Sequence, residues 1–310
     1  MRMSPTAMTK SSLLAALALC SVVSACGRND LEAIELSNQA DKDKSANLDA
    51  AISKYEQAVQ LDPKNFRIAY KLGQAYVKKE KWDAVASTMA KAAKLAPTHA
   101  DYKLWQGIAL ARQAAKGGAG VVWADAKAPL EESVKLDPNL AEGYFELADV
   151  NLHMDDEAGA IANYGKAIGA RPDKAEYYAP LADLYKRLGF LDQAEAVLKE
   201  GISFAKPGDK NSFVLQTHLG DTYDRKMQNG PALVAYEAAR KSCGDCNEGG
   251  QQIAFFNLGV AYAQADRKGE AIAQLQTFNK LICKTGAGAR YQAQCQQAMQ
   301  TAQTLGETLK

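Results

Sequence analysis

Four cysteines close to the C-terminal end are the residues of this chain best suited to chemistry: Cys243, Cys246, Cys283 and Cys295. Four thiols can form two disulfides or bind one zinc ion, and the Cys-x-x-Cys pair can exchange with a substrate disulfide. A redox pair of this kind is expected at a helix N-terminus inside a βαβ unit. The sequence has no window rich in strand-forming residues, so the choice depends mainly on the compartment in which the chain resides.

The chain begins with a segment typical of export. Arg2 and Lys10 supply positive charge before an apolar run of about 11 residues at 13–23. A helix needs about 20 residues to cross a bilayer, whereas the core of a signal peptide needs about 7–15. We therefore interpret this segment as a signal peptide and not as a membrane-spanning anchor.

The residues around Cys26 point to the attachment of lipid. Small residues at Ser24 and Ala25 precede Cys26, and this arrangement resembles the lipobox of bacterial lipoproteins. The resemblance implies that residues 1–25 are removed and that acyl chains, palmitate among them, are attached to Cys26, with a short linker over 26–31. Ordinary cleavage that leaves Cys26 as a free thiol is the alternative.

The lipid would act as a near-permanent membrane anchor, because each buried methylene contributes about 0.8 kcal/mol. Gly27 follows the lipidated cysteine. By resemblance to Gram-negative lipoproteins, it replaces the aspartate that retains such proteins in the inner membrane. The resemblance therefore implies an outer-membrane protein on the periplasmic face, which contacts the membrane through the lipid on Cys26.

An oxidising compartment favours disulfides over zinc or free thiols. Four cysteines allow three connectivities, and the sequence does not choose among them. We favour the local pairs, Cys243 with Cys246 and Cys283 with Cys295, as staples for the C-terminal part of the fold. A four-cysteine zinc site and a redox pair stay open as alternatives.

Composition and the remaining motifs exclude other classes of function. The full chain has 37 basic and 36 acidic side chains, without a basic stripe, so nucleic acid is not an expected partner. His99, His153 and His218 are isolated from other metal-ligand residues, and no nucleophile elbow or nucleotide-binding glycine motif occurs. We expect no catalytic residues, no metal, no cofactor and no small-molecule substrate.

The rest of the chain repeats. Pro63, Pro97, Pro138 and Pro172 close similar phrases, separated by 34, 41 and 34 residues, and small and aromatic residues recur between them. This phase resembles the tetratricopeptide repeat (TPR), a helix-turn-helix unit. The resemblance implies an all-α, right-handed TPR solenoid of about seven repeats over 32–310.

The repeat units and their departures from the pattern can be placed along the chain. An insertion of about seven residues near 114–121, rich in glycine, is expected as a surface loop in the third unit. A final helix near 288–308 is expected to cap the last apolar face. The units are expected near 30–65, 66–99, 100–140, 141–174, 175–208, 213–246 and 252–285.

In TPR arrays the first helix of each unit lines the concave wall, mainly through its second, fifth, ninth, twelfth and thirteenth positions. Residues at the thirteenth position, Arg187 and Arg225, are candidates to pair with acidic neighbours. We expect apolar anchors and a row of aspartates that together hold a partner segment with basic residues at its middle, although a solvated face with local ion pairs is the alternative. The expected partner-binding residues are Tyr70, Leu104, Phe145, Asp149, Asp183, Asp221 and Phe256.

Lipobox and repeats together resemble the envelope TPR lipoproteins of Gram-negative bacteria, which include pilotins and the TPR lipoproteins of myxobacterial gliding machinery. The resemblance implies a non-catalytic scaffold that binds other cell-envelope proteins and aids assembly of a pilus, gliding or secretion complex. Two alternatives come from other classes: a thiol-disulfide oxidoreductase acting through Cys243 and Cys246, and a solute- or glycan-binding lipoprotein.

Overall fold

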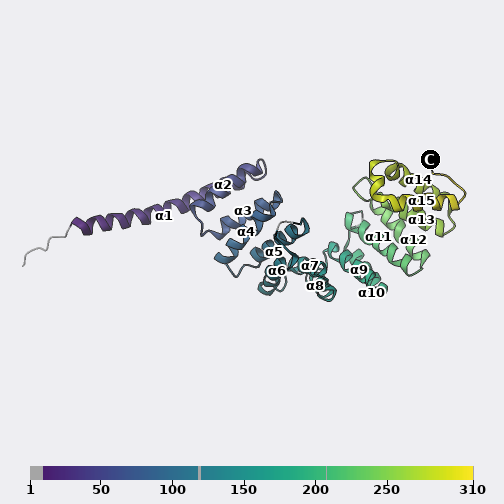
Figure 1. The fold of residues 1–310 in the computed structure, drawn as a ribbon, viewed down its shortest axis with the longest axis horizontal. Coiled ribbons are helices and arrows are strands. Elements are labelled where there is room, and N and C mark those ends of the chain that lie inside the picture. Colours follow the sequence, from purple (N-terminus) through teal and green to yellow (C-terminus); the bar gives the residue numbers. More distant parts are fainter. Residues whose placement is uncertain (1–9, 118–119, 207, 310) are drawn as a thin grey trace, which may run out of the picture. The chain divides into compact units, whose positions relative to one another are not determined.

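The computed structural model describes residues 10–117, 120–206 and 208–309, with side chains from residue 27 onward. Every regular element in these ranges is a helix (Figure 1). The chain divides into two compact units, Met1–Met154 and Asp155–Lys310, which are described separately below.

The first unit contains seven helices among its described residues. Successive helices pack against each other as hairpins, α1 with α2, α3 with α4 and α5 with α6, and α7 packs against α6. The second and third hairpins fall within the predicted repeats 66–99 and 100–140, whereas α1 begins at Lys10, before the predicted start of the first repeat near residue 30. The helices are α1 (Lys10–Asp43), α2 (Leu48–Leu61), α3 (Phe66–Lys78), α4 (Trp82–Leu95), α5 (Ala100–Ala115), α6 (Trp123–Leu136) and α7 (Ala141–His153).

The second unit repeats the same hairpin, and α15 (Gln292–Thr304) follows the last one as an additional helix. Short helical turns at Ala175–Tyr177, Asn279–Cys283 and Gly286–Tyr291 adjoin the longer helices. The all-helical TPR fold with a C-terminal helix is therefore confirmed. The other helices are α8 (Glu157–Ala170), α9 (Tyr178–Arg187), α10 (Leu191–Phe204), α11 (Lys210–Arg225), α12 (Asn229–Ser242), α13 (Ile253–Gln264) and α14 (Lys268–Phe278).

Local sequence determines where several helices begin. The side chains of Asn47, Asn65, Asp156 and Asp209 each accept a hydrogen bond from a backbone N–H of the first turn, in α2, α3, α8 and α11 respectively. Such caps satisfy backbone donors that have no partner inside the helix. These capping residues thus mark where the four helices begin.

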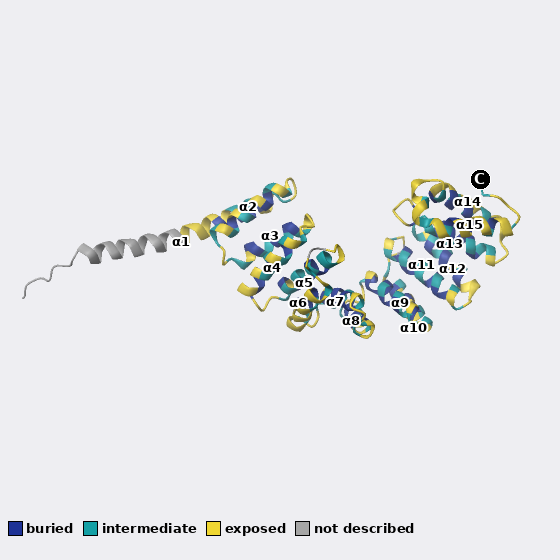
Figure 2. Cartoon of the chain, viewed as in Figure 1, coloured by how far each residue is buried: buried dark blue, intermediate teal, exposed yellow. Residues whose placement is uncertain are grey.

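The two helices of a hairpin approach closely where the first helix carries glycine. A Cβ atom on Gly73 would overlap the side chain of Met89, and one on Gly220 would overlap the ring of Tyr236. The small residues of the repeat therefore leave room for a large side chain from the second helix. Along the helices, buried residues alternate with intermediate and exposed ones (Figure 2).

The C-terminal helix is joined to the array by a disulfide. Cys283 and Cys295 are bonded, with their Cα atoms 5.7 Å apart, and Cys295 packs in a buried cluster with Phe278 and Ala298. A second disulfide joins Cys243 and Cys246, whose Cα atoms are 4.7 Å apart, just after α12. The structure thus contains the local pairs that the sequence favoured.

Two predicted boundaries remain: the end of the signal peptide with its short linker, and the insertion near 114–121. Helix α1 runs without interruption through 26–31, but the side chain of Cys26 and residues 1–9 lie outside the described part. Removal of a signal peptide and lipidation therefore stay predictions. No helix in the described ranges is both long and apolar enough to cross a membrane. The predicted insertion falls between α5 and α6, where residues 118–119 are outside the described part.

Candidate protein-binding surface

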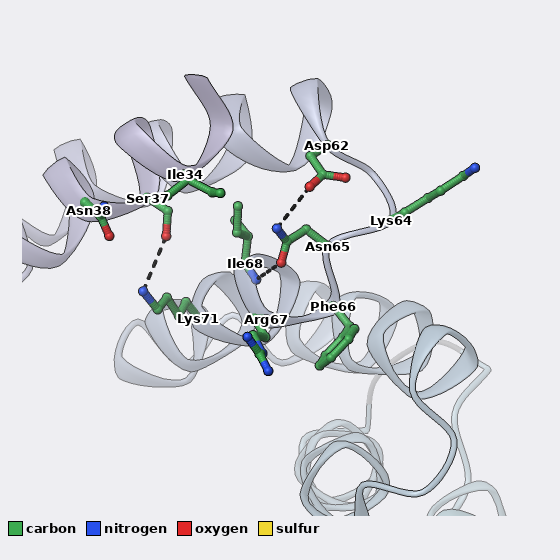
Figure 3. Close-up of a pocket in the computed structure, with 10 residues that line it drawn as sticks. All are labelled: Ile34, Ser37, Asn38, Asp62, Lys64, Asn65, Phe66, Arg67, Ile68 and Lys71. Atoms are coloured by element: carbon green, nitrogen blue, oxygen red, sulfur yellow. Dashed lines mark hydrogen bonds between the residues drawn. The ribbon is translucent and has the colours of Figure 1, made fainter. Parts of the chain in front are cut away.

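A surface pocket of about 600 Å³ lies between α1 and α3 in the first unit (Figure 3). One side comes from α1, and the other comes from the turn before α3 and the first turns of that helix. Both helices are the first helices of their hairpins, which are the ones expected to line the inner wall. The lining residues are Ile34, Ser37, Asn38, Asp62, Lys64, Asn65, Phe66, Arg67, Ile68 and Lys71.

The pocket coincides with the positions that the repeat phase assigns to the concave wall. Counting from residues 30 and 66, Ile34 and Asn38 occupy the fifth and ninth positions of the first repeat, and Arg67 occupies the second position of the next. All three line the pocket. The sequence rule was therefore applicable here, although none of these residues was among the predicted binding residues.

The turn that forms one side of the pocket is held by its own hydrogen bonds. The Asn65 side-chain amide donates to Asp62 Oδ2 at 3.0 Å, and its oxygen accepts from the Ile68 backbone N–H at 3.3 Å (Figure 3). Ile68 itself is buried. This side of the pocket is consequently preformed, with Asp62 already engaged within the turn.

The three cations of the pocket differ in their partners. Lys71 donates to Asp41 Oδ2 at 2.5 Å and to Ser37 Oγ at 3.5 Å, which links α3 to α1. Burial opposes ionisation of Asp41, but the hydrogen bonds from Lys71 and Tyr55 outweigh it and hold the pKa of this carboxyl below its usual value. Lys71 is therefore neutralised by its own fold.

Lys64 and Arg67 have no carboxylate within ion-pair distance among the described residues. Both side chains are exposed. The Arg67 guanidinium lies 5.7 Å from the centroid of the Phe66 ring, at the distance of a cation–π contact. The pocket therefore presents two cations that are not compensated within the fold, next to an aromatic side chain.

Tyr70, one of the predicted anchors, lies one turn further along α3. It is half-buried, and its ring centroid is 5.1 Å from that of Tyr102 on α5. The centroid of the Tyr102 ring also lies 5.1 Å from that of His99 and 6.2 Å from that of Phe66. Tyr70 thus belongs to an aromatic cluster that continues from the pocket toward the third repeat.

The other predicted anchors differ in exposure. Leu104 is 2% exposed and Phe256 is 8% exposed, and each lies in an apolar core cluster; the Phe256 ring is 5.4 Å from that of Phe278. The expectation that Phe256 is an exposed anchor is wrong, because neighbouring helices cover it. Leu104, which was expected to bind a partner, is covered in the same way. Phe145 is half-buried on α7.

The predicted aspartates of the second unit face an internal cation. The Lys186 amine lies 2.7 Å from Asp221 Oδ2, 3.4 Å from Asp183 Oδ1 and 3.0 Å from His218 Nδ1. Arg225, predicted as a partner, lies 3.5 Å from Asp221. The carboxylates of Asp183 and Asp221 already have cationic partners. The second unit therefore does not contain an uncompensated acidic row.

Burial and these neighbours set the protonation of the cluster. Burial raises the pKa of Asp221, but the hydrogen bond and charge of Lys186 outweigh it, so the net shift is downward. Burial lowers the pKa of His218, and the adjacent Lys186 charge lowers it further, against the opposing effect of Asp183 and Asp221. The folded state therefore favours ionised Asp221 and neutral His218.

Asp149 belongs to the first unit, where it is half-buried on α7. On the same helix, buried Glu146 accepts a hydrogen bond of 2.7 Å from the Arg112 guanidinium on α5. Burial raises the pKa of Glu146, and the Arg112 charge opposes that shift. Glu146, three residues before Asp149, is thus paired with a cation of the fold.

Comparable pairs join the first helices of successive repeats: Lys71 with Asp41, Arg112 with Glu146, and Lys186 with Asp221. The separations of 30, 34 and 35 residues are close to one repeat. Lys186, at the twelfth position of its repeat, was missed because only the thirteenth position was considered for cations. Opposite charges about one repeat apart are the signal that would have revealed it.

The two cysteine pairs lie in the second unit, one just after α12 and the other between the segment after α14 and α15. Cys246 is fully buried and packs in the C-terminal apolar cluster, so its sulfur is not placed for attack on an external substrate. Within the described residues, no group of three or more His, Cys, Asp or Glu side chains is arranged to hold a metal ion.

Comparisons with known proteins identify the repeat. Residues 46–80 match a family model described as TPR repeat, and residues 141–174 match one described as tetratricopeptide repeat. No curated protein matches the chain. The chain therefore carries tetratricopeptide repeats, in agreement with the resemblance found in its sequence.

Solved structures share the fold at low sequence identity. PilF of Pseudomonas aeruginosa is 12% identical, with a TM-score of 0.56 over 74% of this chain and 96% of that protein. MamA, residues 41 to the end, from Desulfovibrio magneticus RS-1 is 17% identical, with a TM-score of 0.50 over 56% of this chain and 94% of that one. At such identities the likeness concerns the fold alone.

Proposed function

We propose that this chain is a non-catalytic scaffold of the bacterial cell envelope, which binds other envelope proteins through the inner wall of its TPR repeats. The observation that carries the proposal is the pocket between α1 and α3, formed at the positions where such repeats contact partners. TPR units expose an extended concave surface suited to protein segments.

The shape and lining of the pocket favour a protein segment as its ligand. It lies between two neighbouring helices and combines the apolar Ile34 with polar and charged side chains (Figure 3). Tyr70, which is half-buried and packs on the buried Tyr102, adds an aromatic side chain beside it. A side chain of a partner can enter the pocket while the adjoining segment follows the wall, whereas a small solute would contact only part of this surface.

The anchor that we propose is lipid on Cys26, on the periplasmic face of the outer membrane. The lipobox-like residues and the short apolar run support it. Cys26 precedes Ile34 by eight residues, which along a helix is about 12 Å. A lipid at Cys26 would therefore keep the pocket close to the membrane surface, where the components of a pilus, gliding or secretion complex are available for assembly.

The test is site-specific photo-crosslinking in intact cells. A photoreactive amino acid at position 34 is expected to form adducts with one or a few envelope proteins, which mass spectrometry then identifies. The matched control carries the same amino acid at position 91, an exposed site on α4 away from the pocket. Absence of protein adducts at position 34, or identical adducts at both positions, would refute a binding role for the pocket.

A further inference from the structure

We infer that the ligand of the pocket between α1 and α3 is an acidic segment of a partner protein, with an apolar side chain next to its carboxylates. This inference rests on the proposed function and specifies the chemistry of the partner. It reverses the sign of the segment that the sequence alone predicted.

The first step concerns charge. Among the titratable side chains that line the pocket, Lys71 is paired with Asp41, whereas Asp62 accepts a hydrogen bond from the neutral Asn65 amide and keeps its negative charge. Lys64 and Arg67 are exposed and, within the described residues, lack a carboxylate partner. A ligand that enters the pocket therefore meets two exposed cations against one carboxylate, and carboxylates are the groups complementary to this excess of positive charge.

The second step concerns the apolar side of the pocket. Ile34 is 46% exposed although it lines the pocket, and Leu31, three residues earlier on α1, is 71% exposed. Residues three apart on a helix lie on the same side. Together with Phe66, these side chains offer apolar contact area next to the two cations, so a purely ionic ligand would leave that area uncovered.

The third step separates a protein segment from an anionic membrane surface, which also carries negative charge and apolar chains. Helix α1 carries the exposed Asp30 four residues before Ile34, on the same side of the helix, and Asp62 lines the pocket itself. A flat anionic bilayer would meet these carboxylates as well as the two cations. A narrow segment can approach Lys64 and Arg67 alone, so the distribution of charge favours the segment.

The fourth step concerns the alternative wall. In the second unit Lys186 and Arg225 already neutralise the predicted acidic row. A basic segment would have to displace these cations, of which Lys186 is almost fully buried. The described surfaces therefore offer stronger complementarity to an acidic segment in the first unit than to a basic one in the second.

The test uses the full chain purified in a non-ionic detergent and three fluorescent hexapeptides with blocked ends. The first places a leucine–phenylalanine pair between two pairs of glutamates. The second replaces the glutamates by lysines, and the third replaces the apolar pair by glycines. Fluorescence anisotropy is expected to show the first peptide binding at least about tenfold more tightly than either of the others, with affinity that falls as salt is raised.

Substitutions in the pocket give the second arm. Lys64→Glu/Arg67→Glu is expected to weaken binding of the glutamate peptide by about tenfold or more, and Ile34→Ser by several fold at all salt concentrations. The matched control Lys91→Glu/Lys94→Glu changes two exposed lysines of α4 that lie outside the pocket. It is expected to retain most of the affinity, because the added charge is screened over that distance.

The outcomes separate this inference from the proposed function. Equal or tighter binding of the lysine peptide, or unchanged binding by Lys64→Glu/Arg67→Glu, would overturn the acidic ligand while crosslinks from position 34 could still establish a partner site. Loss of those crosslinks would overturn the site itself. Stronger binding of the full chain to vesicles containing anionic lipid than to neutral vesicles, which accept the lipid anchor equally, would assign the pocket to lipid and also overturn the inference if the same double substitution abolished the difference and no peptide bound.

Discussion

The amine of Lys186 on α9 lies 2.7 Å from the carboxylate of Asp221 on α11, one repeat further along the chain. The Lys186 side chain is only 3% exposed, whereas that of Asp221 is 42% exposed. The first helices of neighbouring repeats are therefore joined by a buried cation as well as by apolar packing. Removing one charge of a buried pair lowers stability mainly because the opposite charge is left without a partner.

Lys186→Met is expected to lower the free energy of unfolding by about 1–3 kcal/mol. A fully buried pair costs about 3–5 kcal/mol when one partner is removed, but Asp183 and Asp221 are partly hydrated, so the loss is smaller. Urea unfolding followed by circular dichroism measures the change. Lys241→Met, at an exposed site on α12, is the matched control and should shift stability by less than about 0.5 kcal/mol. Equal effects of both substitutions would contradict a structural role for Lys186.

The same cluster predicts a dependence of stability on pH. Burial and the Lys186 charge lower the pKa of His218 below its usual 6.5, and Asp183 and Asp221 oppose that shift. Stability from a histidine with a depressed folded-state pKa is fully present above the unfolded pKa. It is lost as the pH falls below about 6.5, because the unfolded state then binds more protons.

Urea unfolding at pH 7.5 and pH 5.5 tests this. The wild-type chain should be less stable at the lower pH, and His218→Gln should reduce that difference, because glutamine does not titrate. His153→Gln is the comparison, since that histidine lies outside the Lys186 cluster and stacks on Trp123. If the stability of His218→Gln changes between the two pH values as much as that of the wild type, protonation of His218 is not the cause of the pH dependence.

The hairpin phase could be predicted from sequence because it depends on local chemistry. Prolines follow the second helix of the first four hairpins, such as Pro63 beyond α2, and glycines stand at several hairpin contacts, such as Gly73. Both act within one repeat: proline cannot continue a helix, and glycine permits close approach. The pattern therefore predicted the order of hairpins and the final helix.

The binding surface was less predictable because exposure depends on the neighbouring repeat. Leu104 and Phe256 stand at the same phase as Tyr70, yet adjacent helices bury them. Ile34 was overlooked because the first repeat lacks the small and aromatic residues of the pattern, so its inner positions were not considered. Arg67 was overlooked because residues at the second position of each repeat were not compared. The burial of Lys186 likewise results from packing of α9 against α11, which spacing alone does not show.

Because the two helices of the hairpin are in close contact at Gly220, we expect that a larger side chain is not tolerated at this position. Gly220→Ala should destabilise the chain by about 1–3 kcal/mol, because the added methyl overlaps the Tyr236 ring and the hairpin must open. Gly165→Ala, on an exposed site of α8 where a Cβ atom meets nothing within 4 Å, should instead stabilise by about 0.5–1 kcal/mol. Thermal unfolding of both variants measures the two signs, and a neutral Gly220→Ala would show that the helices can separate freely.

The disulfide between Cys283 and Cys295 is expected to stabilise the C-terminal end. It joins residues 12 apart in sequence, and closing such a loop in the unfolded chain contributes about 3 kcal/mol in the chain-entropy model. Cys283→Ala/Cys295→Ala should lower the melting temperature while helix content at low temperature stays nearly unchanged. Cys243→Ala/Cys246→Ala, which opens a shorter loop, should have the smaller effect, about 2 kcal/mol. Titration of four reactive thiols in protein isolated from the periplasm would contradict both pairs.

The membrane anchor that we propose would depend on one sulfur atom, because the apolar run at 13–23 is too short to span a bilayer. Cys26→Ser should abolish labelling by radioactive palmitate, since a serine hydroxyl does not replace the thiol in lipid transfer, and should move the protein from the membrane fraction to the soluble fraction. Cys20→Ser is the matched control, because it removes the other cysteine near the predicted cleavage site, and it should leave labelling and fractionation unchanged. Palmitate incorporation that persists in Cys26→Ser and disappears in Cys20→Ser would move the anchor to Cys20 and refute the proposed site.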